Sequence, residues 1–325
     1  LTSITGLRDW SSQNGADLDF STAAIWTRDF EDNFVEFDTF SQELRLTGTA
    51  GDVDWMVGGF YGTEDVVRQD SITLGSAYEP YLSIALLSNI AANFPAGVIN
   101  TAGAATFLSE AVGRPFGTTF VGVTDFDRYE QDSDSLALFT NNTWHASDAL
   151  DLTLGLRYTR EDKSADTLLS NPNGGIGCGS ALANPATVGA ALAGRGVPSQ
   201  FIAGVVPTVI GFMCLPWSNA LHDGRAFSQE RDEDEWSGKL KAAYRWNPQL
   251  MTFASAARGY KAGGFNLDRA QSANGLSSGA SGIVPVNDTS FPAEFVDAYE
   301  LGLKSTLMDG NLLLNAALYY QEFED

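Results

Sequence analysis

The chain of 325 residues carries 41 acidic and 19 basic side chains, giving a formal net charge of −22, and 44% of its residues are hydrophobic. Its apolar content excludes an intrinsically disordered chain, and its charge excludes a general nucleic-acid binder, which needs basic surface for phosphates. Two cysteines and two histidines are too few for a disulfide scaffold, a multi-cysteine metal domain or extensive histidine chemistry. We therefore expect no cofactor and no nucleic-acid partner.

Two apolar stretches, 81–94 and 183–213, are the best candidates for a membrane-spanning helix. Polar residues interrupt the first stretch and three prolines interrupt the second, whereas a spanning helix needs about 18 or more nearly continuous apolar residues. We therefore expect no transmembrane helix. The chain also begins without an initiator Met or an apolar leader, so we expect either a processed chain or a fragment.

Alternation of apolar with polar or small residues is the main pattern in the sequence, and it predicts β-strands. In chain order it occurs at 43–47, 53–57, 150–159, 236–246, 299–304 and 312–320. Short turns rich in Gly, Pro, Asn or Asp are expected at 49–52, 146–148, 247–248 and 308–310. One incoming strand and four hairpins with short turns give about nine strands.

Between the hairpins we expect long irregular connections at about 11–36, 62–130, 161–230 and 261–293, of which two carry short helices. Connections of this length are unusual in a compact soluble domain. They are ordinary in outer-membrane barrels, which have tight turns on one side and long extracellular loops on the other. The pattern thus predicts an all-β fold, an antiparallel transmembrane β-barrel, and a soluble β-sandwich is the alternative.

Aromatic residues gather at both ends of the predicted strands. Trp144 and Trp246 lie next to short turns, whereas Tyr158, Trp236 and Tyr299 lie toward the long connections. Two aromatic girdles on either side of an apolar band are typical of membrane barrels. This arrangement favours the barrel over the sandwich.

Several of these hairpins resemble those of TonB-dependent outer-membrane receptors, of the kind abundant in sphingomonads and related alphaproteobacteria. The similar stretches are Phe40–Leu46 with Val53–Tyr61, Leu136–Trp144 with Leu150–Arg160, Arg258–Asn266, and Tyr299–Ser305 with Asn311–Ala317. The stretch Arg-Gly-Tyr-Lys-Ala-Gly-Gly-Phe-Asn at 258–266 is the most specific of them. Four such hairpins in the order of the family make a stronger signal than any one of them.

The resemblance implies a barrel of 22 strands with a plugged lumen in the bacterial outer membrane. Residues 1–325 would be the central part of this single domain, without its plug and C-terminal strands. The implied function is uptake of a scarce bulky nutrient, an iron–siderophore above all, driven through the TonB complex that acts on the plug. Outer-membrane lipid and lipopolysaccharide are the other implied partners. A passive porin, a structural or adhesin barrel, and a secreted soluble all-β protein are the alternatives.

Basic side chains on the predicted strands are the candidate contacts for a ligand or a plug. Arg258, Tyr260 and Lys261 lie where a strand enters a Gly-rich connection, and strand-end packing is the alternative role for them. Other cations should point inward, either toward the lumen or into ion pairs with Glu43 and Glu300; these are Arg45, Arg157, Lys239, Lys241, Arg245 and Lys304.

Three further motifs concern covalent, metal and enzymatic chemistry. Cys178 and Cys214 fall in one long connection that faces the oxidising exterior, so we expect a disulfide between them. The run Asp232, Glu233, Asp234 and Glu235 is interpreted as a solvated loop end, with a divalent-cation site toward lipopolysaccharide as the alternative. The Gly-x-Ser-x-Gly match at 275–279 has no later histidine, so we expect no enzyme.

Overall fold

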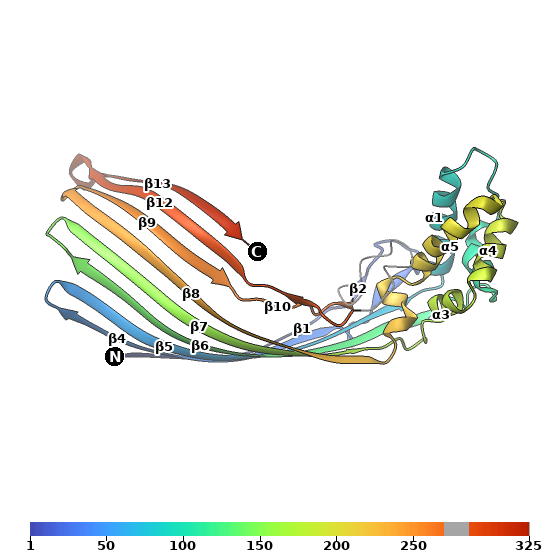
Figure 1. The fold of residues 1–325 in the computed structure, drawn as a ribbon, viewed down its shortest axis with the longest axis horizontal. Coiled ribbons are helices and arrows are strands. Elements are labelled where there is room, and N and C mark those ends of the chain that lie inside the picture. The colour runs from blue at the N-terminus through green and yellow to red at the C-terminus, as the bar shows by residue number, and fades with distance from the viewer. Residues whose placement is uncertain (270–285, 325) are drawn as a thin grey trace.

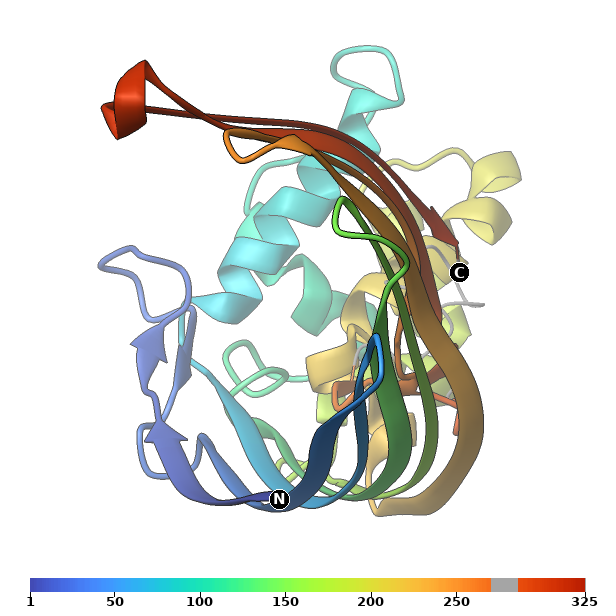
Figure 2. The ribbon, with the colours of Figure 1, turned by 90° about the vertical axis from the view of Figure 1, so that its left-hand side faces the viewer.

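The computed structural model describes residues 1–269 and 286–324. Long antiparallel strands follow one another in chain order and form one sheet that curls into an open trough (Figures 1 and 2). The nine long strands are β1 (Thr2–Gln13), β4 (Phe34–Ala50), β5 (Val53–Leu74), β6 (Gly122–His145), β7 (Leu150–Leu169), β8 (Arg225–Asn247), β9 (Leu250–Lys261), β12 (Glu294–Leu307) and β13 (Leu312–Glu324). The predicted fold class and the expected count of about nine strands are confirmed.

Short turns join the strands at one end of the trough, where the sequence predicts them. They lie between β4 and β5, β6 and β7, β8 and β9, and β12 and β13. Gly51 in the first turn has φ of 60°, a left-handed conformation that glycine adopts without steric cost. The described parts of the long connections lie toward the opposite end (Figure 1), so the sheet has the asymmetry of an outer-membrane barrel.

The central strands extend much further into the expected loops than the alternation predicts. β6 has 24 residues, about 80 Å at roughly 3.3 Å per residue, whereas a tilted membrane strand needs only about 9–11 residues. The ladder between β7 and β8 continues through the pairs Asp162–Asp232 and Glu161–Glu233. The run 232–235 therefore lies inside β8, and its interpretation as a loop end is wrong.

The apolar face of the sheet identifies the membrane zone. Cross-strand pairing aligns Leu154 with Leu240 and Tyr158 with Trp236, so these side chains share one face. From Trp246 to Trp236 on β8 is ten residues, about 33 Å along the strand and about 25 Å along the normal of a strand tilted by roughly 40°. This spacing matches the apolar band of a barrel, and the residues beyond Trp236 toward the long connections project past it.

Helices cover the end of the sheet that carries the long connections (Figure 1). The α-helices are α1 (Tyr78–Ala92), α2 (Phe107–Val112), α3 (Ile176–Ala183), α4 (Pro185–Gly194) and α5 (Ser199–Met213). Short 3-10 turns are η1 (Ala104–Thr106), η2 (Pro216–Ser218), η3 (Ala220–His222) and η6 (Met308–Gly310). The short strands are β2 (Ala16–Asp17), β3 (Trp26–Arg28), β10 (Gly264–Phe265) and β11 (Ser290–Phe291).

The two longest connections, 75–121 and 170–224, pack together into a helical cap. Its core contains Leu86, Leu87, Phe107, Val188, Leu192, Val209 and Met213, all buried. A disulfide joins Cys178 to Cys214, so the pairing expected from the sequence is present. Arg195 is buried and donates to Glu110 Oε2 at 3.0 Å. The connections expected to be irregular with short helices are therefore a packed unit with its own apolar core.

In the described part of the chain, no single helix is long and apolar enough to cross a membrane; only α3 and α4, bent by 91°, pass that test as a pair.

Candidate functional site

The polar face of the sheet brings three of the predicted cations together. Arg157 pairs with Ser237, Gly155 with Lys239, and Thr153 with Lys241 across β7 and β8. All of these positions alternate with the apolar positions of the same strands, so they face the lumen of a barrel. The expectation that Arg157, Lys239 and Lys241 point away from lipid therefore agrees with the register.

A hollow of about 470 Å³ lies on this lumen-facing wall, and we call it the wall hollow. Its floor is formed by residues with small side chains, which leave space above the backbone: Gly155, Ser237, Ala257, Gly259 and Ala298. Phe139, Met56, Arg157 and Lys239 border it, together with Asn141. Asn141 Oδ1 is buried and has no hydrogen-bond partner among the described residues. The hollow thus offers cations and an unused amide oxygen.

Arg157 is the best-positioned side chain of the wall hollow. Its guanidinium lies 5.4 Å from the ring centroid of Phe60 and 5.7 Å from that of Phe139, distances at which cation–π attraction operates. Its Nε donates to Thr159 Oγ1 at 2.9 Å, and Thr159 shares a side-chain hydrogen bond with Tyr260. Within the described residues Arg157 has no acidic partner, so its charge is held in place but not neutralised.

The two neighbouring lysines, like Arg157, lack an acidic partner among the described residues. Lys241 Nζ lies 4.8 Å from the ring centroid of Phe253, and neither Lys239 nor Lys241 forms an ion pair within the part of the chain that the structure covers. Arginine and lysine side chains form strong charge-assisted hydrogen bonds to anionic groups, and the neighbouring rings help to hold these cations in place. This wall is therefore suited to an anionic group of a ligand or of a protein plug.

Of the other predicted contacts, Arg258 also borders the wall hollow, whereas Lys261 and Arg245 are not among the residues that line it. Arg258 pairs with Gly238 in the β-ladder and thus shares the apolar face; it donates to Asp297 at 3.1 Å. Lys261 is paired with Glu294 at 3.3 Å, and Arg245 is paired with Asp151 at the short-turn end. Among the described residues each of these three cations therefore has an acidic partner, unlike Arg157, Lys239 and Lys241. Tyr260 is linked to Arg157 of the wall hollow through the side chain of Thr159.

Among the remaining inward charges, pairing differs from one residue to the next. Arg45 forms an ion pair with Glu43 on β4, as the sequence suggests. Among residues 1–269 and 286–324, neither Lys304 nor Glu300 forms an ion pair. The acidic run of β8 alternates between faces, and no group of three or more His, Cys, Asp or Glu in the described chain could hold a metal ion. The Gly-x-Ser-x-Gly match at 275–279 lies outside the described residues.

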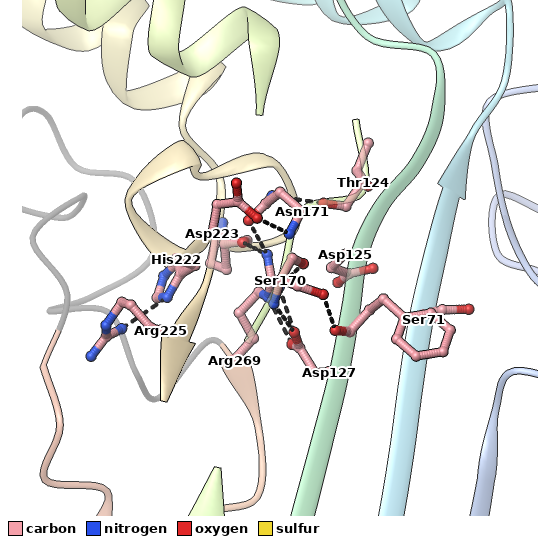
Figure 3. Close-up of polar contacts among 12 residues, drawn as sticks. Ser71, Thr124, Asp125, Asp127, Ser170, Asn171, His222, Asp223, Arg225 and Arg269 are labelled. Carbon is pink, nitrogen blue, oxygen red and sulfur yellow. Dashed lines mark hydrogen bonds and ion pairs between the residues drawn. The ribbon is translucent and has the colours of Figure 1, made fainter. Parts of the chain in front are cut away.

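A second polar cluster, the buried network, lies at the base of the helical cap (Figure 3). Its centre is an ion pair between Arg269 and Asp127, whose side chains are 5% and 2% exposed. Burial raises the pKa of Asp127, and it raises the pKa of nearby Asp125 well above the ordinary value. Burial, with Arg269 and Arg225 close by, lowers the pKa of His222 to about 3. His222 is therefore neutral at physiological pH.

Little in the sequence indicates this network. Arg269 lies in the Gly-rich stretch 261–293, with no periodicity around it. Asp125 and Asp127 are two acids among 41, and only the fold shows that they are buried. The alternation Thr124, Asp125, Phe126, Asp127 was the available signal, because it places two acids on one face of an extended strand.

The model of the family described as "TonB dependent receptor-like, beta-barrel" matches residues 2–325. The ferric yersiniabactin uptake receptor FyuA from Yersinia pestis is similar in fold, with a TM-score of 0.58 and 14% identity over 99% of this chain and 33% of that one. The siderophore receptor PiuA from Acinetobacter baumannii has a TM-score of 0.46 and 13% identity, over 98% of this chain and 36% of PiuA. No curated protein sequence matches.

The chain thus spans about a third of the length of these solved receptors. At 14% identity the likeness to FyuA shows the fold alone. An alphaproteobacterial origin stays a prediction.

Proposed function

Because the chain belongs to the TonB-dependent receptor β-barrel family, we propose that it forms part of a bacterial outer-membrane transporter that takes up a scarce, bulky nutrient. An iron–siderophore complex is the favoured ligand, and the TonB complex supplies the energy. The observation that carries the proposal is the wall hollow, where Arg157 and Lys239 face the lumen without acidic partners among the described residues. FyuA, which shares the fold, is a ferric yersiniabactin receptor.

The architecture supports a larger closed barrel. In the part of the chain that the structure covers, β1 and β13 are the two edges of the sheet. Unpaired edge amides in lipid cost several kcal/mol each, so further strands must continue the ladder. We infer that residues 1–325 are the central part of one barrel domain, and that a plug domain of the same polypeptide occupies its lumen and contacts TonB.

The cations of the wall hollow can attract an anionic ligand although the net charge of the chain is negative. The net charge of −22 repels anions at long range, but salt screens this repulsion beyond about 8–10 Å. Inside the lumen, the local cations dominate because they are closer to the ligand and partly desolvated. A chelate with carboxylate or catecholate oxygens can therefore pass the acidic strand extensions and bind at the wall hollow.

The test compares uptake by cells that produce the complete receptor with or without the two lumenal cations. Arg157→Gln combined with Lys239→Gln should lower the affinity for an anionic ferric chelate by roughly tenfold or more, since hydrogen bonds to charged groups are worth about 1.5–3 kcal/mol each. Arg160→Gln is the control, because Arg160 pairs with Asp162 on the apolar-facing side of β7 at 3.0 Å. Equal uptake in all three strains would remove the hollow from the transport path.

A further inference from the structure

Five side chains form a continuous row of contacts beside the short turns, and we call this row the turn belt: Thr49, Asp54, His145, Asp151 and Arg245. They belong, in that order, to β4, β5, β6, β7 and β8. Asp151 lies two positions before Thr153 on β7 and pairs with His145 across the ladder, so the belt shares the lumenal face. It connects three hairpins at the end of the sheet opposite the helical cap (Figure 1).

His145 is the centre of the turn belt. Its Nδ1 lies 2.7 Å from Asp151 Oδ1, and its Nε2 lies 3.0 Å from Asp54 Oδ2. An ionised carboxylate can only accept a hydrogen bond, and a neutral imidazole has one N–H, whereas an imidazolium has two. Both contacts are therefore hydrogen bonds only while His145 is protonated.

The surroundings of His145 favour that proton. Its side chain is 41% exposed, and it follows Trp144 of the aromatic row next to the short turns, so it exchanges protons with water. The hydrogen bonds to Asp151 and to Asp54 raise the pKa of His145 above its ordinary value. The charged side chains that face it come from three neighbouring strands: Asp54 of β5, Asp151 of β7 and, through its ion pair with Asp151, Arg245 of β8.

Loss of the proton leaves a single N–H for two carboxylates. Asp151 is the closer one, is 13% exposed and is also held by Arg245, whereas Asp54 is 56% exposed. The remaining N–H therefore stays on Asp151, and the bare nitrogen repels Asp54. We propose that His145 is a proton-operated tie between the β4–β5 turn and the β6–β7 turn, closed when the imidazole is protonated and released when it is neutral.

The pKa of His145 sets the direction of this switch. Because the pKa is higher in the folded chain than the ordinary value of about 6.5, the stabilising contribution is complete below the ordinary value and is lost as pH rises through the folded value. His222, the other histidine of the chain, stays neutral here because burial lowers its pKa to about 3. Short turns of outer-membrane barrels face the periplasm, so the tie makes the periplasmic rim of the lumen more rigid in acid than in base.

The experiment is amide hydrogen exchange of the complete receptor in lipid vesicles, at about pH 5.5 and about pH 8.5. Each rate is divided by that of an unfolded peptide at the same pH, which gives a protection factor. The amide of His145 donates to the Asp52 carbonyl at 2.8 Å and so reports on the two turns directly. Its protection should fall about twofold to fivefold as pH rises, the range that exposed ion pairs provide. The β12–β13 turn, which has no histidine, should not respond.

Three variants separate the tie from a general effect of pH. His145→Arg keeps a permanent cation with several N–H donors, so protection at position 145 should stay high at both pH values. His145→Gln carries no charge and should show the low protection at both. Asp54→Asn should also abolish the response, because only the contact with Asp151 remains.

A native protein whose protection at position 145 does not change with pH would overturn the tie, and so would a His145→Gln variant that still responds. The tie concerns the rim and not the wall hollow, and neither a ligand nor TonB enters the measurement. Its failure would therefore leave the transport proposal standing, and a failure of uptake would leave the tie standing.

Discussion

The orientation of the sheet predicts how a charge is tolerated on neighbouring residues of one strand. Ala254 and Ser255 are adjacent on β9 and both are small. Ala254 pairs with Ala242 and Leu301, on the apolar face, whereas Ser255 pairs with Lys241 and Glu300, on the lumenal face. Arginine at either position has the same size and strand propensity. Any difference between Ala254→Arg and Ser255→Arg therefore reports which face meets lipid.

The magnitude follows from the depth of Ala254. It is four residues from Leu250, the first residue of β9 after the short turn, and a membrane strand spans about 9–11 residues. Ala254 thus lies near the midplane, where arginine costs about 2–4 kcal/mol, or about 30- to 900-fold in the folded-to-unfolded ratio. Ser255→Arg faces lumenal water, with Glu300 opposite it, and should cost less than about 1 kcal/mol.

The assay is urea unfolding of the complete receptor in lipid vesicles, followed by the loss of the heat-modifiable band on gels. Ala254→Arg should shift the midpoint to lower urea, and Ser255→Arg should stay close to the native protein. Equal destabilisation by both substitutions, or a larger effect of Ser255→Arg, would refute the assignment of the faces. It would favour a sheet that is buried or solvated on both sides.

Two further predictions concern the helical cap and its base. Cys178→Ser with Cys214→Ser removes a link across 36 residues, worth about 4 kcal/mol in the chain-entropy model, so amide exchange in α3 and α5 should accelerate while exchange in β7 stays slow. Burial raises the pKa of Asp125 well above its ordinary value; its stabilising contribution is complete below the unfolded pKa of about 3.9 and is lost as pH rises through the folded pKa. Asp125→Asn should therefore gain thermal stability over the native protein as pH rises, and a gain that shrinks with pH would contradict the sign.

Strands, turns and faces were predictable where one face is apolar. In β7, Leu150, Leu152, Leu154 and Leu156 alternate with polar or small residues, and this period fixes both the strand and the side that meets lipid. From Glu161 onward both faces are polar, so the alternation disappears although the ladder continues to Leu169. Backbone pairing with β8, which no local pattern encodes, holds this extension.

The helical cap and the buried network depend on contacts between distant segments. Leu86 and Leu87 of α1 are buried in one apolar core that both long connections share. Arg269 and Asp127 are 142 residues apart, and nothing near either residue indicates the other. Of the candidate contacts, the alternation placed Arg157, Lys239 and Lys241 on the lumenal face. The outward position of Arg258 required the register of β9 against β8.

Energised uptake through this barrel is measured most directly by the accumulation of a radiolabelled ferric chelate. Cells lacking their own receptor for that chelate would produce the complete protein, with functional TonB or with TonB deleted. We predict accumulation against a gradient only when both the receptor and TonB are present. Accumulation that is equal without TonB, or that never exceeds the external concentration, would contradict the account and indicate a passive pore.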